Sequence, residues 1–183
     1  GKPLQQPGVV IANHPGLLDF IVFLQDFPNA VCLYKSQSLQ NPVLSSFVQV
    51  AGYIEGMDGT PAATKRIIAA CRARLKEGHQ VVLFPEGTRS PDAISVRKFR
   101  TTGFHAVIKS RAPLQPVAIY YQPLLLGKGQ RWMEFCQSPI HVTIRYLSII
   151  HTEDLPEEKQ TAAELAKAAH KSICDALDDM AAQ

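Results

Sequence analysis

Short apolar runs alternate with segments of helical periodicity along this chain. The runs that predict strands cover residues 9–12, 30–34, 52–55, 80–84, 116–121 and 141–150. One segment that predicts a helix begins near Gly16, and others cover residues 38–50, 61–77, 102–111 and 156–180. Residues 122–137 predict either an irregular excursion or a strand followed by a loop. Strands that alternate with helices bury a sheet between helical layers. The sequence therefore predicts an α/β fold with a mixed, mostly parallel sheet flanked by helices.

The length and composition fit one domain. With 183 residues, of which 46% are hydrophobic and 19% charged, the chain has the composition of a globular protein with a sizeable core. We therefore expect a single domain over residues 1–183. No run of 18 apolar residues occurs, so no transmembrane span is predicted. The chain begins abruptly at Gly1, and a segment cut from a longer, membrane-associated protein stays open as an alternative.

Basic residues are clustered, although the formal net charge is only +3. A charge this small argues against the dense basic face of a nucleic-acid-binding domain. One cluster lies on the predicted helix at 61–77, where a solvated helix face is the favoured interpretation. A second cluster suits anionic lipid headgroups or a phosphorylated substrate. It consists of Arg97, Lys98, Arg100, Lys109 and Arg111.

The four cysteines, Cys32, Cys71, Cys136 and Cys174, stand far apart among apolar neighbours. No C-x-x-C pair occurs, so the pattern favours neither a zinc site nor a disulfide framework. We expect buried free thiols in a reducing compartment. The six histidines show no close paired spacing, so no metal site is expected.

His14 follows the predicted strand at 9–12 and precedes Asp19 by five residues in the stretch V-V-I-A-N-H-P-G-L-L-D. Pro15 and Gly16 force a turn, which can fold His14 back onto the carboxylate of Asp19. Asp19 would then accept a hydrogen bond from one ring nitrogen and leave the other nitrogen free to act as a general base. The alternative is a strand-end histidine that bonds a nearby carbonyl, with Asp19 exposed on the helix.

The second stretch with chemical content is F-P-E-G-T-R-S at residues 84–90. Gly87 permits a tight turn, Thr88 supplies a hydroxyl, and Arg89 supplies a planar cationic fork that suits phosphate. Glu86 can accept from a substrate hydroxyl or hold Arg89. The alternative is an ordinary turn with a surface Arg–Glu pair. Because both stretches follow buried strands, a parallel sheet would bring them to one edge.

Together these two stretches resemble the glycerolipid acyltransferase superfamily, whose first motif is N-H-x4-D and whose third is F-P-E-G-T-R-S. The resemblance extends from about Val9 to Ile119, and residues 114–119 (L-Q-P-V-A-I) resemble the fourth motif. The second motif usually carries an arginine, but residues 52–58, G-Y-I-E-G-M-D, have none. This departure leaves the acceptor open between a phosphate-bearing lysolipid, an amino-acid lysolipid and another alcohol.

The resemblance implies a glycerol-3-phosphate acyltransferase-like fold and an O-acyltransferase in phospholipid synthesis. A fatty acyl group would move from an acyl-CoA or acyl carrier protein thioester to a lysolipid hydroxyl, with 1-acyl-glycerol-3-phosphate as the default acceptor. His14 would be the base and Asp19 the residue that orients it, with no cofactor beyond the acyl co-substrate and no metal. A thioester hydrolase, and a lipid- or acyl-carrier-binding module without turnover, stay open as alternatives.

The resemblance also implies how the chain meets its partners. The acceptor would bind to Glu86, Gly87, Thr88 and Arg89, with its phosphate on Arg89. The acyl chain needs an apolar groove, and the leucines at 124–126 could line one, although a place in the core is the favoured interpretation. The expected location is the cytoplasmic face of a membrane, reached peripherally or through an anchor outside this chain. No nucleic-acid partner is expected.

Overall fold

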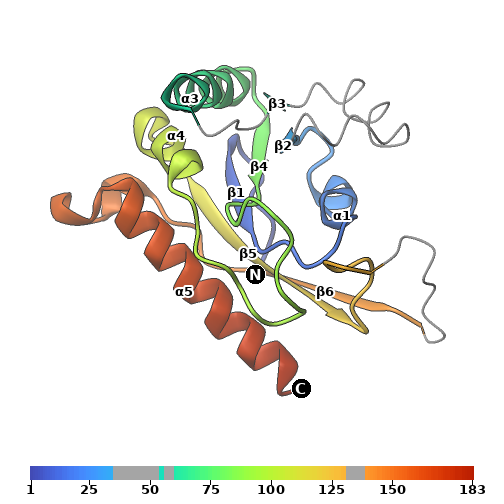
Figure 1. The fold of residues 1–183 in the computed structure, drawn as a ribbon. Coiled ribbons are helices and arrows are strands. Elements are labelled where there is room, and N and C mark those ends of the chain that lie inside the picture. The colour runs from blue at the N-terminus through green and yellow to red at the C-terminus, as the bar shows by residue number, and fades with distance from the viewer. Residues whose placement is uncertain (35–53, 56–59, 131–138) are drawn as a thin grey trace.

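The computed structural model describes residues 1–34, 54–55, 60–130 and 139–183 of the chain. Within these ranges the strands form one sheet of six, in the order β3-β2-β4-β1-β5-β6 (Figure 1). The strands are β1 (Gly8–Ala12), β2 (Val31–Tyr34), β3 (Ile54–Glu55), β4 (Gln80–Leu83), β5 (Leu114–Gln122) and β6 (His141–Tyr146). Neighbouring strands run parallel except for β5 and β6, which confirms the predicted mixed, mostly parallel sheet.

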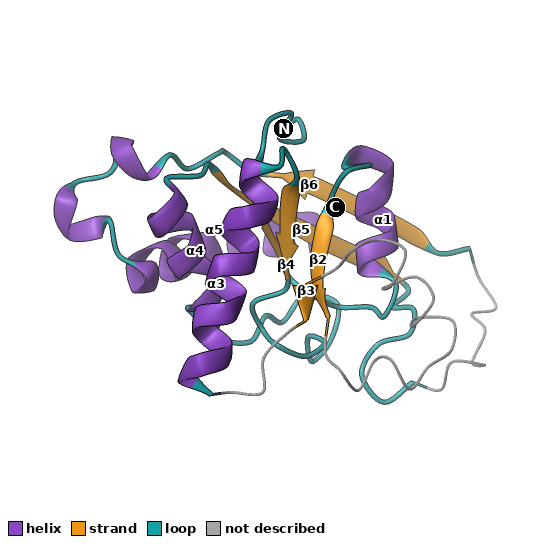
Figure 2. Ribbon diagram, turned by 90° about the horizontal axis from the view of Figure 1, so that it is seen from above, coloured by secondary structure: helices purple, strands orange, loops and turns teal. Residues whose placement is uncertain are grey.

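Helices cover both faces of this sheet, as the view from above shows (Figure 2). One face carries α3 (Pro61–Lys76), α4 (Thr102–Ser110) and α5 (Ala162–Ala181), and the other carries α1 (Asp19–Asp26). Successive side chains of β1 point to opposite faces, so Val9 and Ile11 join the core beneath α3, α4 and α5. Val10 and Ala12 join the second core beneath α1. A strand buried on both faces has the continuous apolar run seen in the sequence.

The position of β1 decides where the two motifs meet. β1 lies between β4 and β5, with Ile11 opposite Leu83 and Ala12 opposite Val117. Because all three strands are parallel, the residues after β1 and after β4 leave the sheet at the same carboxyl edge. This is the edge at which open α/β sheets place their ligands.

Two helices begin later than the sequence predicts. α1 begins at Asp19 rather than near Gly16, because residues 16–18 form a turn that the Asp19 carboxylate closes by accepting from the Gly16 backbone N–H. α5 begins at Ala162 rather than at residue 156, because Glu157–Lys159 forms a separate 3-10 turn. The hydroxyl of Thr161 then caps α5 by accepting from the Glu164 backbone N–H at 3.2 Å.

The boundaries of α3 agree with the prediction, whereas β5 begins two residues earlier than predicted, at Leu114, and β6 ends four residues earlier, at Tyr146. The Thr60 hydroxyl caps α3 by accepting from the Ala63 backbone N–H at 3.2 Å, and the helix ends before Gly78, whose φ is +92°. The predicted helix at 38–50 and most of the second-motif stretch at 52–58 lie outside the described residues. Residues 123–130 form neither helix nor strand, in agreement with the irregular interpretation of this stretch. None of the helices in the described ranges has the length and apolar character needed to cross a bilayer.

The cysteines agree with the expectation of free thiols where they can be seen. Cys32 and Cys71 are buried and unpaired, and burial raises the pKa of each thiol to about 12. Cys174 is a half-buried free thiol on α5, and Cys136 lies outside the described residues.

Candidate active site

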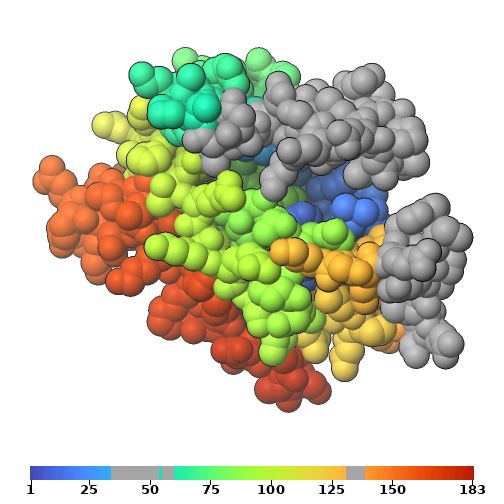
Figure 3. All heavy atoms as spheres, viewed as in Figure 1, coloured from blue at the N-terminus to red at the C-terminus, as the bar shows by residue number. Residues whose placement is uncertain are grey.

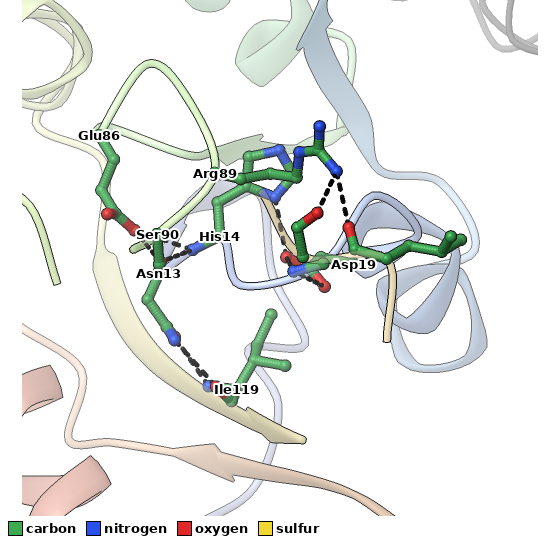
Figure 4. A network of polar contacts seen from close by, with 10 residues as sticks. Asn13, His14, Asp19, Glu86, Arg89, Ser90 and Ile119 are labelled. Atoms are coloured by element: carbon green, nitrogen blue, oxygen red, sulfur yellow. Dashed lines mark hydrogen bonds and ion pairs between the residues drawn. The ribbon is translucent and has the colours of Figure 1, made fainter. Parts of the chain in front are cut away.

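His14 and Asp19 meet across the turn that follows β1 (Figure 4). Nδ1 of His14 lies 2.8 Å from Oδ2 of Asp19. The Asp19 side chain is wholly buried, whereas the His14 side chain is 22% exposed. Asp19 is also the first residue of α1, where the helix dipole favours a negative charge. The expected fold-back of His14 is therefore present, and the alternative of an exposed Asp19 is wrong.

This hydrogen bond determines which nitrogen of His14 can take up a proton. A carboxylate can only accept, so Nδ1 is the donor, and in the neutral imidazole Nε2 then keeps its lone pair. The ring of His14 also stacks on Phe84, with 4.4 Å between the centroids and 26° between the planes. Asp19 and Phe84 thus hold the partly exposed imidazole, whose Nε2 can act as a base.

Two further groups bind the Asp19 carboxylate. The Gly16 backbone N–H lies 3.1 Å from Oδ1 and 3.0 Å from Oδ2. The hydroxyl of Tyr121 on β5 also hydrogen-bonds to Asp19, and burial, together with the Asp19 charge, raises the pKa of Tyr121 well above its ordinary value. Tyr121 therefore stays protonated and donates. Sequence reasoning missed Tyr121, because a buried aromatic residue in a strand gives no local signal of a polar contact.

Gly16 permits the close packing of this turn against the loop after β5. A Cβ at Gly16 would lie 2.9 Å from the Leu125 carbonyl oxygen and 3.0 Å from Asp19 Oδ1. Backbone oxygen cannot move aside as a flexible side chain can, so a side chain at this position would displace the loop or the carboxylate.

Asn13 ties the end of β1 to β5. It is 1% exposed, its Nδ2 donates to the Ile119 carbonyl, and its Oδ1 accepts from the Ile119 backbone N–H, each at 2.8 Å (Figure 4). The sequence places Asn13 in the first motif without indicating these partners. Its contacts anchor the chain one residue before His14.

Glu86 is a buried residue of the loop that follows β4. It is 4% exposed, and its Oε1 accepts from the His14 backbone N–H at 2.9 Å and from the Ser90 hydroxyl at 2.6 Å. Its Oε2 accepts from the Arg97 backbone N–H at 2.8 Å. Over the described ranges, the expected Glu86–Arg89 pair is not formed, because backbone donors and Ser90 occupy the buried carboxylate. Sequence reasoning also missed Ser90.

Arg89 reaches the loop that follows β5. Its Nη1 donates to the carbonyl oxygens of Leu126 at 2.7 Å and Gly127 at 2.8 Å (Figure 4). In the space-filling view, the loop that carries Arg89 adjoins residues 123–130 (Figure 3). Arg89 is half-buried, and the neighbouring Thr88 is exposed. The guanidinium therefore joins two loops that follow different strands.

The tight turn predicted at Gly87 is confirmed. Its backbone N–H donates to the Phe84 carbonyl at 3.1 Å, and its φ of +71° is one that residues with a side chain rarely adopt. A Cβ there would lie 2.7 Å from Nε of Arg100. Arg100 therefore packs directly over the turn.

The remaining candidate surfaces are partly described. Leu124 and Leu125 pack against the core beneath α1, in agreement with the core interpretation, so an acyl groove stays a prediction. Of the second basic cluster, only Arg97 is half-buried, and its Nε donates to the Arg89 carbonyl at 3.3 Å. The other four members are exposed. Within the described ranges, no group of three or more His, Cys, Asp or Glu side chains is placed to hold a metal ion.

Comparisons with known proteins identify the family of this chain. The family model described as Acyltransferase matches residues 2–120, a range that includes both motifs. A 1-acyl-sn-glycerol-3-phosphate acyltransferase of Cocos nucifera is 27% identical over 153 residues, which cover 82% of this chain and 48% of the relative. A lyso-ornithine lipid O-acyltransferase of Rhodobacter capsulatus is 31% identical over 125 residues, which cover 66% of this chain and 44% of the relative. The chain thus spans about half the length of these curated relatives.

The fold also matches a solved structure. The crystal structure of the 1-acyl-sn-glycerophosphate acyltransferase from Thermotoga maritima aligns with a TM-score of 0.74 and 23% identity. The alignment covers 99% of this chain and 69% of that one, which confirms the predicted fold. Since the family model covers more than half of the sequence and both of its motifs, the chain belongs to the Acyltransferase family, within the glycerolipid acyltransferase superfamily.

Proposed function

We propose that this chain is an O-acyltransferase that moves a fatty acyl group from a thioester to a lysolipid hydroxyl. The observation that carries the proposal is the 2.8 Å contact between His14 Nδ1 and the buried Asp19 at the carboxyl edge of the sheet. This contact leaves Nε2 of a partly exposed imidazole as the base. The names of the relatives support the same reaction class.

The chain's residues would act on the acceptor hydroxyl. Nε2 of His14 takes the proton of the hydroxyl while the acceptor oxygen attacks the thioester carbonyl carbon. The C–S bond then breaks, and the departing thiolate takes the proton back from His14. One ester forms, one thioester is lost, and the substrate itself supplies the nucleophile. A positioned base of this kind contributes roughly 10²- to 10⁴-fold to the rate.

Asp19 would act through His14. The carboxylate holds the imidazole in the tautomer that leaves Nε2 unprotonated, and its charge stabilises the imidazolium that forms during the reaction. The hydrogen bonds from Gly16 and Tyr121 keep the carboxylate in place while it does so. Asp19 therefore has its function without contacting either substrate.

The acceptor would bind at the loop after β4, and 1-acyl-glycerol-3-phosphate is the acceptor we propose first. Arg89 would hold the phosphate, because its planar fork matches two phosphate oxygens. In the part of the chain that the structure describes, Arg89 uses Nη1 for its carbonyl contacts, so the Nε–Nη2 edge remains for an anion. The hydroxyl of the exposed residue Thr88 and the turn at Gly87 would complete the acceptor site. The donor would be an acyl-CoA or acyl carrier protein.

An amino-acid lysolipid is the second candidate acceptor. Residues 52–58 lack the arginine that is usual in the second motif, which removes one positive charge expected for a phosphate-bearing acceptor. The Rhodobacter capsulatus relative is a lyso-ornithine lipid O-acyltransferase by name and is 31% identical to this chain. Both observations favour testing an ornithine-type lysolipid beside lysophosphatidate.

The membrane surface is the proposed place of action, on its cytoplasmic face. Lys98 and Arg100 are exposed next to the acceptor loop. A basic residue near an anionic surface contributes about 1 kcal/mol to binding, and salt weakens this attraction. Binding to vesicles that contain phosphatidylglycerol should therefore fall as salt rises, and fall further when Arg97, Lys98 and Arg100 are replaced by serine. Vesicle binding that changes neither with salt nor with the serine substitutions would count against this surface.

The decisive experiment measures thiol release from a long-chain acyl-CoA, with and without 1-acyl-glycerol-3-phosphate or a lyso-ornithine lipid. His14→Ala is compared with His79→Ala, because His79 is also half-buried and its Nδ1 also donates a hydrogen bond, to the Asn29 carbonyl oxygen at 2.8 Å. Acceptor-dependent release that only His14→Ala abolishes would support the transferase and name the acceptor. A carrier-protein donor is tested in the same way if CoA thioesters are inert.

Two outcomes would redirect the proposal. Release that needs His14 but no acceptor identifies the thioester hydrolase. Binding of acyl donor or lysolipid without any thiol release, from either donor class, identifies the binding module.

A further inference from the structure

Both polar groups of the His14 backbone are bound by the loop that follows β4. The N–H donates to Glu86 Oε1 at 2.9 Å and to Ser90 Oγ at 3.2 Å. The carbonyl oxygen accepts from the Ser90 backbone N–H at 2.6 Å. Because β1 ends at Ala12, these bonds take over from the strand pairing that the chain has left.

Glu86 is the centre of this arrangement. Besides the His14 N–H, its carboxylate accepts from the Ser90 hydroxyl at 2.6 Å and from the Arg97 backbone N–H at 2.8 Å. Glu86 is 4% exposed and Ser90 is 1% exposed. A buried carboxylate that already accepts from three donors has little capacity left for a substrate hydroxyl.

Different residues therefore contact the imidazole and the backbone of His14. Asp19 and Phe84 contact the ring, whereas Glu86 and Ser90 contact the peptide groups on either side of its Cα. A catalytic base must be held within about 0.5 Å of its productive position. Movement of the backbone by an ångström would shift Nε2 away from the hydroxyl, at a cost of roughly 10²-fold in rate.

We propose that Glu86 and Ser90 are positioning residues that fix His14 through its backbone, and that Glu86 does not bind the acceptor. The inference rests on the proposed role of His14 as the base. It replaces the acceptor-binding role that the resemblance implies for Glu86. The two roles make opposite kinetic predictions, since lost positioning lowers kcat and lost acceptor binding raises KM.

The kinetic test compares Glu86→Ala, Glu86→Gln and Ser90→Ala. The acceptor is a short-chain, soluble 1-acyl-glycerol-3-phosphate or lyso-ornithine lipid, whichever the enzyme uses, at saturating acyl donor. We expect kcat to fall about 100-fold in Glu86→Ala and about tenfold in Ser90→Ala, with acceptor KM within about twofold of wild type. Glu86→Gln should restore part of kcat, because its amide oxygen can still accept from the His14 N–H. A raised acceptor KM at unchanged kcat would overturn the proposal.

The same loop offers matched controls. Asp92 also accepts from two backbone N–H groups, of Ile94 at 2.9 Å and Ser95 at 2.6 Å, and from the Ser95 hydroxyl at 2.7 Å. These bonds stay within the exposed part of the loop. Asp92→Ala and Ser95→Ala should therefore leave kcat unchanged. If they lower kcat as much as the Glu86 and Ser90 variants do, the effect belongs to the loop as a whole and the assignment fails.

Backbone amide exchange, followed by NMR, tests the contacts without turnover. The His14 amide should be protected in the wild type and should exchange at least about tenfold faster in Glu86→Ala, but not in Asp92→Ala. Equal exchange of this amide in wild type and Glu86→Ala would overturn the positioning role. Absence of acyl transfer by the wild type would instead contradict the proposed function. If Glu86→Ala does not fold, the kinetics and the amide exchange are both measured on Ser90→Ala, which keeps the Glu86 carboxylate.

Discussion

The side-chain amide of Asn13 pairs with the backbone of Ile119 through both of its ends, each at 2.8 Å. β1 has ended at Ala12, and Asn13 continues its attachment to β5 with a side chain instead of a peptide group. The backbone is thereby free to turn at His14 while the sheet stays paired beneath it.

Asn13→Ala should lower the free energy of unfolding by about 1–3 kcal/mol, because the Ile119 N–H and carbonyl lose their buried partner. Chemical denaturation measures this. The control is Gln130→Ala, whose exposed amide also makes two backbone hydrogen bonds, to Gly127 and Leu124. We expect that loss to stay below about 1 kcal/mol, since water can replace an exposed partner. Equal losses of unfolding free energy in the two variants would mean that the burial of Asn13 does not increase the contribution of its hydrogen bonds to stability.

Asp19→Asn should lower kcat by about 10²- to 10⁴-fold with little change in KM, because the amide neither holds the imidazole tautomer nor stabilises the imidazolium. Asp26→Asn is the control, since Asp26 lies on the same helix and accepts from the Tyr146 hydroxyl at a distance from His14. The control should retain its activity. An Asp19→Asn variant of nearly normal kcat would remove Asp19 from the mechanism.

Arg89→Lys should raise the KM for 1-acyl-glycerol-3-phosphate by about tenfold or more, because lysine keeps the charge but loses the two-pronged contact. The expected factor corresponds to about 1.4 kcal/mol of binding free energy. Arg72→Lys, on the exposed face of α3, is the matched control and should have no effect. If the acceptor KM of Arg89→Lys does not change, the phosphate lies elsewhere.

Gly87→Ala should lower the free energy of unfolding by more than the cost of backbone strain alone. A left-handed φ costs a residue with a side chain about 1 kcal/mol, and the new Cβ would also displace the Arg100 guanidinium. Gly78→Ala carries a comparable strain at φ +92°, and among the described residues no neighbouring atom lies within 4 Å of the new Cβ. Thermal unfolding should show a loss in both variants, and turnover should fall only in Gly87→Ala. Unchanged turnover in both would show that the turn is not part of the site.

Cys32 and Cys71 should resist alkylation in the native protein. At pH 8 a thiol with a pKa of about 12 is ionised in roughly one molecule in 10⁴, and both side chains are shielded from solvent. Iodoacetamide labelling followed by peptide mass spectrometry should leave them unmodified until a denaturant is added. Rapid labelling of either thiol in the folded protein would contradict its burial.

The sequence was informative wherever burial produces a pattern. β1 and β4 are apolar on both faces because each lies between parallel neighbours under two helical layers, so their runs could be recognised without a structure. The carboxyl ends of parallel strands lie at the same edge of a sheet, and this rule alone predicts that His14 and the loop at 84–90 lie close together. The order of the motifs, and not any one residue, predicted the site.

The sequence does not predict which side chains bind to backbone groups. The sequence predicts Glu86 at a substrate hydroxyl or on Arg89, yet its partners include the His14 and Arg97 N–H groups. Every residue except proline supplies such an N–H, so no residue pattern can reveal which one is used. The late start of α1 has the same origin, since the Asp19 carboxylate binds the Gly16 N–H.

The contact of Arg89 with the Leu126 and Gly127 carbonyls has an energetic consequence. A free arginine side chain loses about 2 kcal/mol of rotamer entropy when it is fixed in one position. In this protein Arg89 loses that rotamer entropy when the chain folds, because two backbone carbonyls already hold the guanidinium. An anion that binds Arg89 meets a donor in place, so its affinity is not reduced by ordering the side chain that receives it.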